Sequence, residues 1–146
     1  MEQQVSGPVA DVRRNAGLVG VTFTGGDSYE ALVRGHRIAV DQPVEAGGAD
    51  SAPTPVELFI ASLAGCVAFY AGRYLTRHGF GRDGLTVAAG FAMADHGPAR
   101  VSDIRLTVRV PASLPAERQS ALHAVVERCT VQNTLVSTPS VVIEVD

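Results

Sequence analysis

The sequence has few of the residues that mark specialised classes of protein. Only two of its 146 residues are cysteines, Cys66 and Cys129, which is too few for the disulfide scaffold of a small secreted protein. Charged residues make up 18%, the formal net charge is −3, and no basic block offers a surface for nucleic acid or an anionic membrane. The N-terminus also lacks the charged and then apolar layout of a signal peptide. We therefore expect a soluble, cytoplasmic protein that binds neither nucleic acid nor membrane.

Metal-binding patterns are absent as well. The four histidines are scattered along the chain, and neither cysteine has a second ligand at the spacing of a zinc site. Residues 58–72 carry no charge, but this run is too short to span a bilayer and indicates a helix buried inside protein. The sequence thus predicts neither a metal site nor a bound cofactor.

What is present is a composition typical of a folded domain. Apolar residues make up 46% of the chain, and its length fits one domain with its own hydrophobic core. No internal repeat or low-complexity tract interrupts it. We expect a single domain over residues 1–146, with residues 1–16 as a loose N-terminal arm.

The first part of the chain predicts an antiparallel meander. Three segments rich in β-forming residues are separated by turn residues at 25–28 and 34–35. The expected strands are residues 18–23, 29–33 and 36–41. Residues 41–55 are rich in Gly, Pro and Asp and predict a long loop, which could act as a mobile lid.

A clear helix start follows this loop. Thr54 suits the N-cap, Pro55 the first helical position and Glu57 the third, which together form a capping box. The helix is expected to run to His78 and to end at Gly79. It is apolar nearly all round as far as Tyr74, which predicts a central helix covered on most sides.

The second part of the chain repeats the order of strands and then a helix. Strands are expected at residues 85–94 and 101–110, and a second helix at residues 115–129. Residues 130–140 are interpreted as a turn-rich connection, and residues 141–145 as a last strand. Strands and helices in this order predict an α+β fold with mostly antiparallel pairing.

The two cysteines are the main chemical candidates. Each is expected on the inward, apolar face of one of the two helices, where a cysteine often only fills space. The alternative is a redox pair, in which one thiolate is oxidised to a sulfenic acid and the other thiol condenses with it. Cys66 lies far from the start of its helix, so a nearby cation would be needed to lower its pKa.

The motifs around the cysteines resemble the OsmC/Ohr family. The resemblance rests on TPVELFIASLAGCVAFY at residues 54–70, VVERCTVQNTL at 125–135 and the preceding loop at 34–50. It implies an OsmC-like fold in which mostly antiparallel sheets enclose two long helices and two chains intertwine as a homodimer. It also implies reduction of organic hydroperoxides, with Cys66 as the peroxidatic cysteine and Cys129 as the resolving one.

Two positions depart from the family pattern. The family's supporting arginine follows a Gly-Gly pair, where this chain has Asp27, and its glutamate follows the helix-opening proline, where this chain has Val56. Glu57, Arg34 and Arg37 are the candidates to replace them. Glu57 is equally explained by helix capping, and each arginine by a solvated position at a strand edge.

Two functions remain open at this point. The first is a thiol peroxidase of the oxidative-stress defence, which reduces organic hydroperoxides through Cys66 and Cys129 and is recycled by a dithiol or lipoyl-type reductant. The second is an OsmC-like dimer that binds a small hydrophobic ligand or senses redox state, with little peroxidase turnover.

Overall fold

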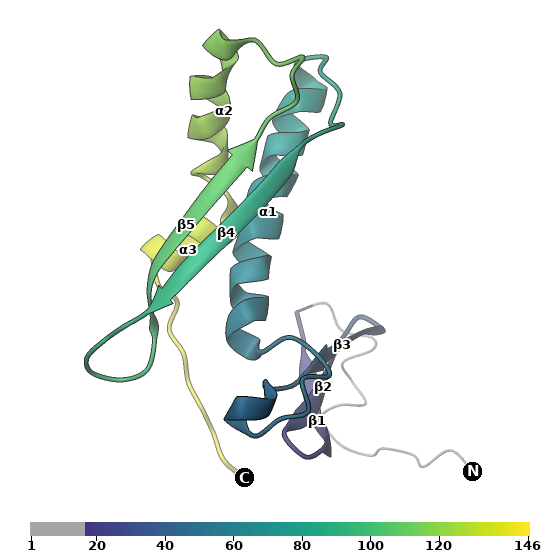
Figure 1. Ribbon diagram of the computed structural model, residues 1–146, viewed down its shortest axis with the longest axis vertical. Helices are drawn as coiled ribbons and strands as arrows, with labels where there is room; N and C mark the ends of the chain where they lie inside the picture. The colour runs from purple at the N-terminus through teal and green to yellow at the C-terminus, as the bar shows by residue number, and fades with distance from the viewer. Residues whose placement is uncertain (1–16) are drawn as a thin grey trace. The chain divides into compact units, whose positions relative to one another are not determined.

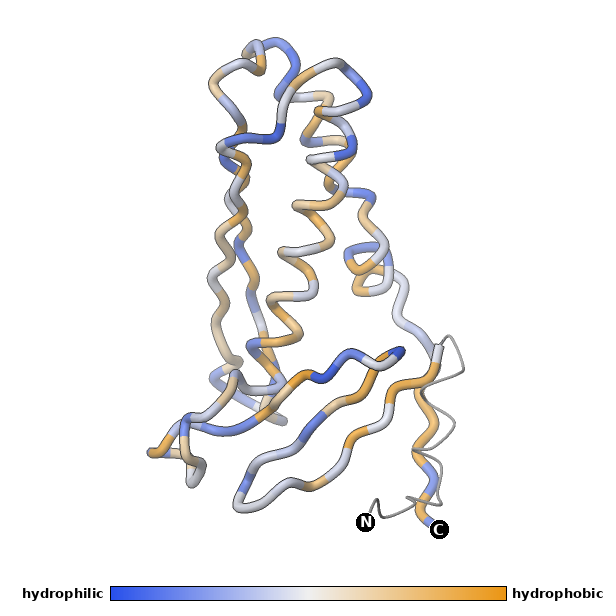
Figure 2. The backbone as a smooth tube through the Cα atoms, turned by 90° about the vertical axis from the view of Figure 1, so that its right-hand side faces the viewer, coloured by the Kyte–Doolittle hydropathy of each residue, from blue (hydrophilic) through white to orange (hydrophobic). Residues whose placement is uncertain are grey.

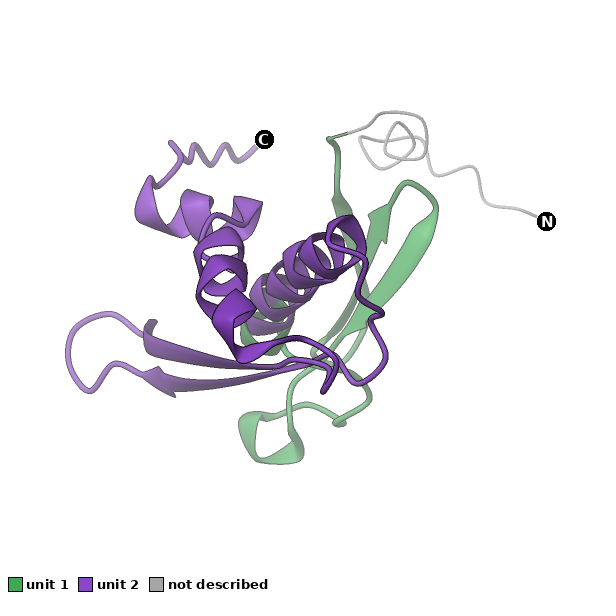
Figure 3. Ribbon diagram, turned by 90° about the horizontal axis from the view of Figure 1, so that it is seen from above, with its two compact units in different colours: residues 1–58 green, residues 59–146 purple. Residues whose placement is uncertain are grey.

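The computed structural model describes residues 17–146, so the expected loose arm at residues 1–16 lies outside the described part. The chain divides into two compact units, residues 1–58 and 59–146, shown in green and purple in Figure 3. Each unit contains one antiparallel sheet. The helices and strands together form the predicted α+β fold, labelled in Figure 1. A single domain over residues 1–146 stays a prediction.

The first unit contains the predicted meander. Its sheet has the order β1-β2-β3, with β1 over Gly20–Gly25, β2 over Ser28–Val33 and β3 over His36–Val40. Gly25 and Gly26 have φ values of 134° and 55°, which explains the glycines in the turn after β1. The strand boundaries lie within two residues of those predicted.

The loop after β3 is held together by a buried carboxylate, that of Asp41. Its Oδ2 atom accepts hydrogen bonds from the hydroxyl of Ser51 at 2.6 Å and from the backbone N–H groups of Ser51 and Ala49. Its Oδ1 atom accepts one from the N–H of Gln42 at 2.8 Å. These bonds, led by that from the Ser51 hydroxyl, lower the pKa of Asp41 well below its usual range. They favour a fixed loop, with the short 3-10 helix η2 at Val44–Ala46, over a mobile lid.

Helix α1 spans Pro55–Arg77, in close agreement with its predicted limits. The hydroxyl of Thr54 accepts a hydrogen bond from the backbone N–H of Glu57 at 3.1 Å and donates one to the Glu57 carboxylate at 3.0 Å. The predicted N-cap is therefore confirmed. At the other end, Gly79 adopts a φ of 78° and the N–H of Phe80 returns to the carbonyl of Leu75, so the last turn is closed by backbone bonds.

The second unit pairs strands β4 (Thr86–Met93) and β5 (Val101–Arg109) in an antiparallel hairpin. On β5 the apolar side chains alternate with exposed polar ones, so that one face of the hairpin packs on the core, as predicted. The fully buried core cluster joins α1 to the segments after β5. Its members are Leu63, Val67, Ala71, Tyr74, Leu75, Leu114, Leu122, Val126 and Cys129.

The predicted second long helix is wrong. The segment instead has a 3-10 turn, η3 (Ala116–Arg118), an eight-residue helix α2 (Gln119–Val126) and a separate helix α3 (Thr130–Val136). The chain turns after α2, so Cys129 lies outside it, and the expected turn-rich connection at residues 130–140 is mostly helix. Among the helices of residues 17–146, α1 alone is long.

Helix α1 is also less covered than predicted. Only 28% of the most apolar 18-residue stretch of this helix is buried, and Phe69 is 55% exposed. By length and composition alone α1 could cross a membrane, a property shared by the core helices of many water-soluble proteins. In Figure 2 the apolar colour runs along α1, which matches a helix with apolar residues on both its buried and its exposed sides.

The predicted last strand does not form. Residues 141–145 pair with no strand in the described part of the chain, and Val145 is 92% exposed. A strand needs a partner for its backbone N–H and C=O groups, and this segment pairs with neither strand of the two-stranded sheet of its unit.

Candidate active site

Cys66 lies in the middle of α1, with its side chain packed against the core cluster but only partly buried. It occupies the edge of the buried stripe formed by Leu63 and Val67. Unlike its buried neighbours on α1, this residue therefore keeps part of its surface open to solvent.

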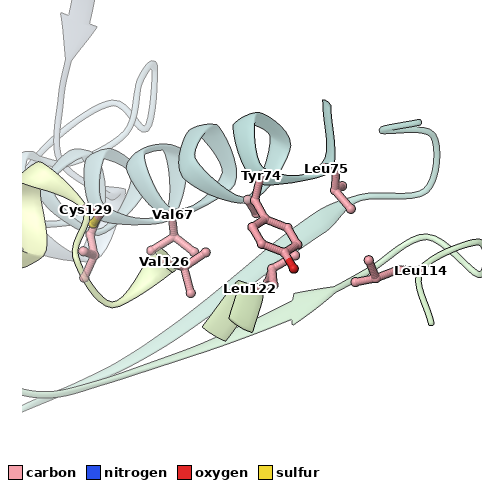
Figure 4. Packing of buried hydrophobic residues seen from close by; sticks show 9 residues of the cluster. Val67, Tyr74, Leu75, Leu114, Leu122, Val126 and Cys129 are labelled. Carbon is pink, nitrogen blue, oxygen red and sulfur yellow. The ribbon is translucent and has the colours of Figure 1, made fainter. Parts of the chain in front are cut away.

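Cys129 is fully buried, with no exposed surface. It is the N-cap of α3, and its Sγ atom accepts a hydrogen bond from the backbone N–H of Gln132 at 3.4 Å. In Figure 4 the sulfur points from the turn after α2 toward α1, beside Val67 and Val126. Cysteine is not a usual N-cap residue, so the sequence carried no signal for a helix that begins at this point.

The two thiols interact with each other in the second unit, and both are free. Burial raises the pKa of the Cys129 thiol, and contact with the Cys66 thiol raises it further. The hydrogen bond from Gln132 acts in the opposite direction but is outweighed. The predicted proximity of Cys66 and Cys129 is confirmed, and its surroundings make the Cys129 thiol harder to ionise than a free thiol.

A hydrogen bond between two hydroxyl groups ties the elements that carry the cysteines. The hydroxyl of Tyr70, one turn beyond Cys66 on α1, lies 3.0 Å from the hydroxyl of Thr130, which follows Cys129. Neither Tyr70 nor Thr130 is among the site residues that the sequence predicts. The sequence signal for Tyr70 is its spacing of four residues from Cys66, which places both side chains on the same face of the helix.

The other candidate residues belong to the first unit, and each has an identified local environment. Arg37, on β3, pairs with Glu30 of β2. Arg34 occupies the turn between β2 and β3 with a φ of 48°, a left-handed conformation in which a non-glycine residue is uncommon. Glu57 bonds to Thr54 at the start of α1.

An apolar cavity of about 610 Å³ lies within the second unit. Its walls come from α1, β5, α2 and α3, and Gln132, whose N–H bonds to Cys129, is among the lining residues. The apolar wall residues include Leu63, Val67, Ile104, Leu106, Leu122 and Val126. A cavity of this size fits a small organic molecule.

The protein thus has an α+β fold. Its candidate site is a pair of thiols at the place where the long helix α1 meets the segment that follows the short helix α2. Residues 48–145 match the family of OsmC-like proteins. The chain belongs to this family, as its sequence motifs indicated. No curated protein sequence matches it.

Solved structures share the fold at low sequence identity. A protein of the osmotic stress and detoxification response from Psychrobacter arcticus is 24% identical, with a TM-score of 0.73, and the match covers 83% of this chain and 90% of that one. The organic hydroperoxide resistance protein OsmC from Legionella pneumophila is 18% identical, with a TM-score of 0.61 and coverage of 81% and 87%. A Vibrio cholerae protein named for organic hydroperoxide resistance, with captopril in one of its active sites, is 18% identical, with a TM-score of 0.63 and coverage of 83% and 85%.

Proposed function

We propose that this protein reduces organic hydroperoxides through Cys66 and Cys129. The observation that carries the proposal is the contact between two free thiols of unequal exposure in one compact unit. Membership of the OsmC-like family supports it, because relatives of the same fold are named for organic hydroperoxide resistance.

The unequal burial of the two thiols supports different roles for them. A peroxide from solvent can reach the partly buried Cys66, whereas Cys129 is fully enclosed. The thiolate is the nucleophile, and the raised pKa of Cys129 keeps that thiol protonated near neutral pH. Cys66 is therefore the peroxidatic cysteine and Cys129 the resolving one.

The reaction then has three balanced steps. The Cys66 thiolate attacks the terminal oxygen of the hydroperoxide, the O–O bond breaks, and the alkoxide takes up a proton and leaves as the alcohol. Cys129 attacks the sulfur of the Cys66 sulfenic acid, and water leaves as the disulfide forms. An external dithiol, which we propose to be of the lipoyl type, reduces the disulfide and is itself oxidised.

Arg34, Arg37 and Glu57 remain the candidates to support the Cys66 thiolate. Arg37 and Glu30 form an arginine–glutamate pair, the combination that the family resemblance implies. Arg34 forms no ion pair in the described part of the chain. Replacing each arginine by glutamine in turn tests which one acts, because loss of the relevant cation would raise the pH at which Cys66 reacts.

A homodimer is supported by apolar surface that the single chain leaves uncovered. The apolar side chains of the C-terminal segment up to Val145 are largely exposed. Large exposed apolar patches mark interaction sites, and a second copy of the chain would cover these. We further propose that the dimer is cytoplasmic, uses no metal or cofactor, binds no nucleic acid or membrane, and acts in the oxidative-stress response.

The test is turnover of cumene hydroperoxide with dihydrolipoamide as the reductant. The proposal predicts consumption of peroxide by the wild-type protein and none above background by Cys66→Ser. The Cys129→Ser variant should accumulate a sulfenic acid that a dimedone-type reagent traps. Equal activity of wild type and Cys66→Ser would refute the proposal.

The cavity in the second unit favours a second candidate function, the binding of a small hydrophobic ligand without turnover. Its apolar walls and volume of about 610 Å³ carry this alternative. In that case Cys66→Ser would bind an apolar probe such as anilinonaphthalene sulfonate as tightly as the wild type does, and neither protein would consume peroxide.

A further inference from the structure

The last turns of α1 line a cleft that combines aromatic and cationic side chains. The cleft has a volume of about 340 Å³ and lies wholly within the second unit. Its lining residues are Phe69, Tyr70, Arg73, Tyr74, Arg77, His78 and Val125. It is separate from the larger apolar cavity, with which it shares no lining residue.

The cations of this cleft have no acidic partner. In the part of the chain that the structure describes, ion pairs join only Arg37 to Glu30 and His123 to Glu127. Arg73 instead lies over the ring of Phe69, 5.5 Å from its centroid. Surface arginines in proteins commonly pair with carboxylates, so a cluster without one has unused capacity for an anion.

A further cation reaches the edge of the cleft from another element. The Nη1 atom of Arg118, in η3, lies 2.8 Å from the Nδ1 atom of His78. Since arginine can only donate, His78 accepts through Nδ1 and directs its other ring nitrogen elsewhere as a donor. The ring of His78 also lies 4.3 Å from that of Tyr74, which fixes its orientation.

Hydrogen-bond capping of the helix end does not account for these cations. Basic residues near the end of a helix often cap its last carbonyls. Here the turn at Gly79 performs that task with backbone bonds, from His78 to Tyr74 and Leu75 and from Phe80 to Leu75. Arg73 and Arg77 are not required as caps.

Tyr74 adds a hydroxyl that has no partner among the described residues. The residue is only 6% exposed, and its hydroxyl forms no hydrogen bond with the described residues. No fully enclosed polar atom in this part of the chain lacks a partner, so solvent must reach this hydroxyl. The cleft is the opening that the Tyr74 ring lines, and Figure 4 shows the ring extending from α1 with its oxygen at the tip.

We propose that this cleft binds the carboxylate of an organic acid whose apolar body lies on Phe69 and Tyr70. Arg73 and Arg77 supply charge and donors, and the Tyr74 hydroxyl supplies one neutral donor. The Tyr70 ring lines the cleft while its hydroxyl bonds to Thr130, so the bound acid lies one side chain from the dithiol. The link between this cleft and the reaction rests on the proposed function. In a peroxidase, the bound acid is either the hydroperoxide substrate or the dithiol reductant.

Binding is tested first with phenylbutyrate, which has a carboxylate and an aromatic body but no peroxide. Isothermal titration calorimetry should show tighter binding of phenylbutyrate than of the uncharged phenylbutanol. The affinity should fall about threefold in Arg77→Gln and about tenfold in Arg73→Gln/Arg77→Gln, since exposed ion pairs are each weak. It should also fall as salt is raised, because these charges are screened.

Matched variants separate charge from structure. Arg77→Lys keeps the charge and should bind within about twofold of the wild type. Arg105→Gln removes an exposed arginine of β5 that does not line the cleft and should have no effect. Equal binding of phenylbutyrate and phenylbutanol, or an equal loss in Arg105→Gln, would overturn the proposal whether or not the protein is a peroxidase.

Two kinetic comparisons then identify the source of the carboxylate. A hydroperoxide that carries a carboxylate is compared with its methyl ester, and dihydrolipoate is compared with dihydrolipoamide. The charged member of one pair should have the lower KM, and the Arg73→Gln/Arg77→Gln variant should lose that preference. If neither pair shows a preference that this variant loses, the link to the dithiol is wrong.

Discussion

Tyr70 and Thr130 join α1 to α3 through a hydrogen bond of 3.0 Å between their hydroxyl groups. Each belongs to an element that carries one of the cysteines, Tyr70 one turn after Cys66 and Thr130 directly after Cys129. The bond therefore holds the two thiol-bearing segments against each other from one side, while the core contacts of Cys129 hold them from the other.

Removing this bond should slow disulfide formation more than it slows attack on the peroxide. Tyr70→Phe is expected to lower the free energy of unfolding by about 0.5–1.5 kcal/mol, the usual contribution of one hydrogen bond. Stopped-flow measurement should show a Cys66 sulfenic acid that forms at the wild-type rate and disappears more slowly. Tyr29→Phe, which alters a tyrosine of β2 in the other unit, is the control and should leave both rates unchanged.

The raised pKa of Cys129 predicts a steep pH dependence. Because the pKa lies above its ordinary value of 9.0, the thiolate is scarce at neutral pH and increases about tenfold with each pH unit. In Cys66→Ser the contribution of Cys66 is lost but burial, the larger cause, remains. Alkylation of Cys129 by iodoacetamide in this variant should rise without a plateau up to about pH 9. A plateau near neutral pH would contradict the assignment.

Asp41 predicts how stability depends on acid. Its pKa is lowered in the folded protein, so folding is favoured above the unfolded value of 3.8 and this contribution is lost as the pH falls below it. Urea unfolding of wild type and Asp41→Asn should show a lower midpoint for the variant near pH 7 and a smaller gap near pH 3. If the difference in midpoint between wild type and variant is the same at both pH values, the charge of Asp41 does not stabilise the loop.

Gly48 lies where the same loop folds most tightly. A Cβ atom added there would overlap the carbonyl oxygen of Gln42 and come within 2.8 Å of Asp41 Oδ1. Gly48→Ala should therefore destabilise the protein by about 1–3 kcal/mol, measured by urea unfolding. Gly81→Ala, where an added Cβ meets nothing within 4 Å, is the control and should change stability by less than about 1 kcal/mol.

Local signals made the first unit and α1 predictable. The turn glycines, the alternating strands and the capping box at Thr54 and Glu57 each act over a few residues, and the structure follows them closely. The segment after Val126 could not be predicted in this way. No glycine or proline marks the break, and the cap of α3 is a cysteine, whose burial against α1 is a tertiary contact.

The candidate site was predictable in part for the same reason. Two cysteines on apolar segments indicated a pair, and family motifs indicated their roles. The Tyr70–Thr130 bond depends on how α1 and α3 meet. The cationic cleft depends on the approach of Arg118 to His78, which lies forty residues away in the chain. At the C-terminal segment, by contrast, the sequence predicts a strand that the structure lacks. The segment is exposed, because a strand needs a partner that this chain does not supply.

The redox pairing of Cys66 and Cys129 is tested by the state of the thiols after one equivalent of cumene hydroperoxide. We expect that both cysteines become inaccessible to alkylation together, that the intact mass falls by two hydrogen atoms, and that digestion yields a peptide linking Cys66 to Cys129. The chain should regain both thiols on addition of dihydrolipoamide. Survival of both free thiols in excess peroxide, or a disulfide between chains in place of the Cys66–Cys129 bond, would contradict this pairing.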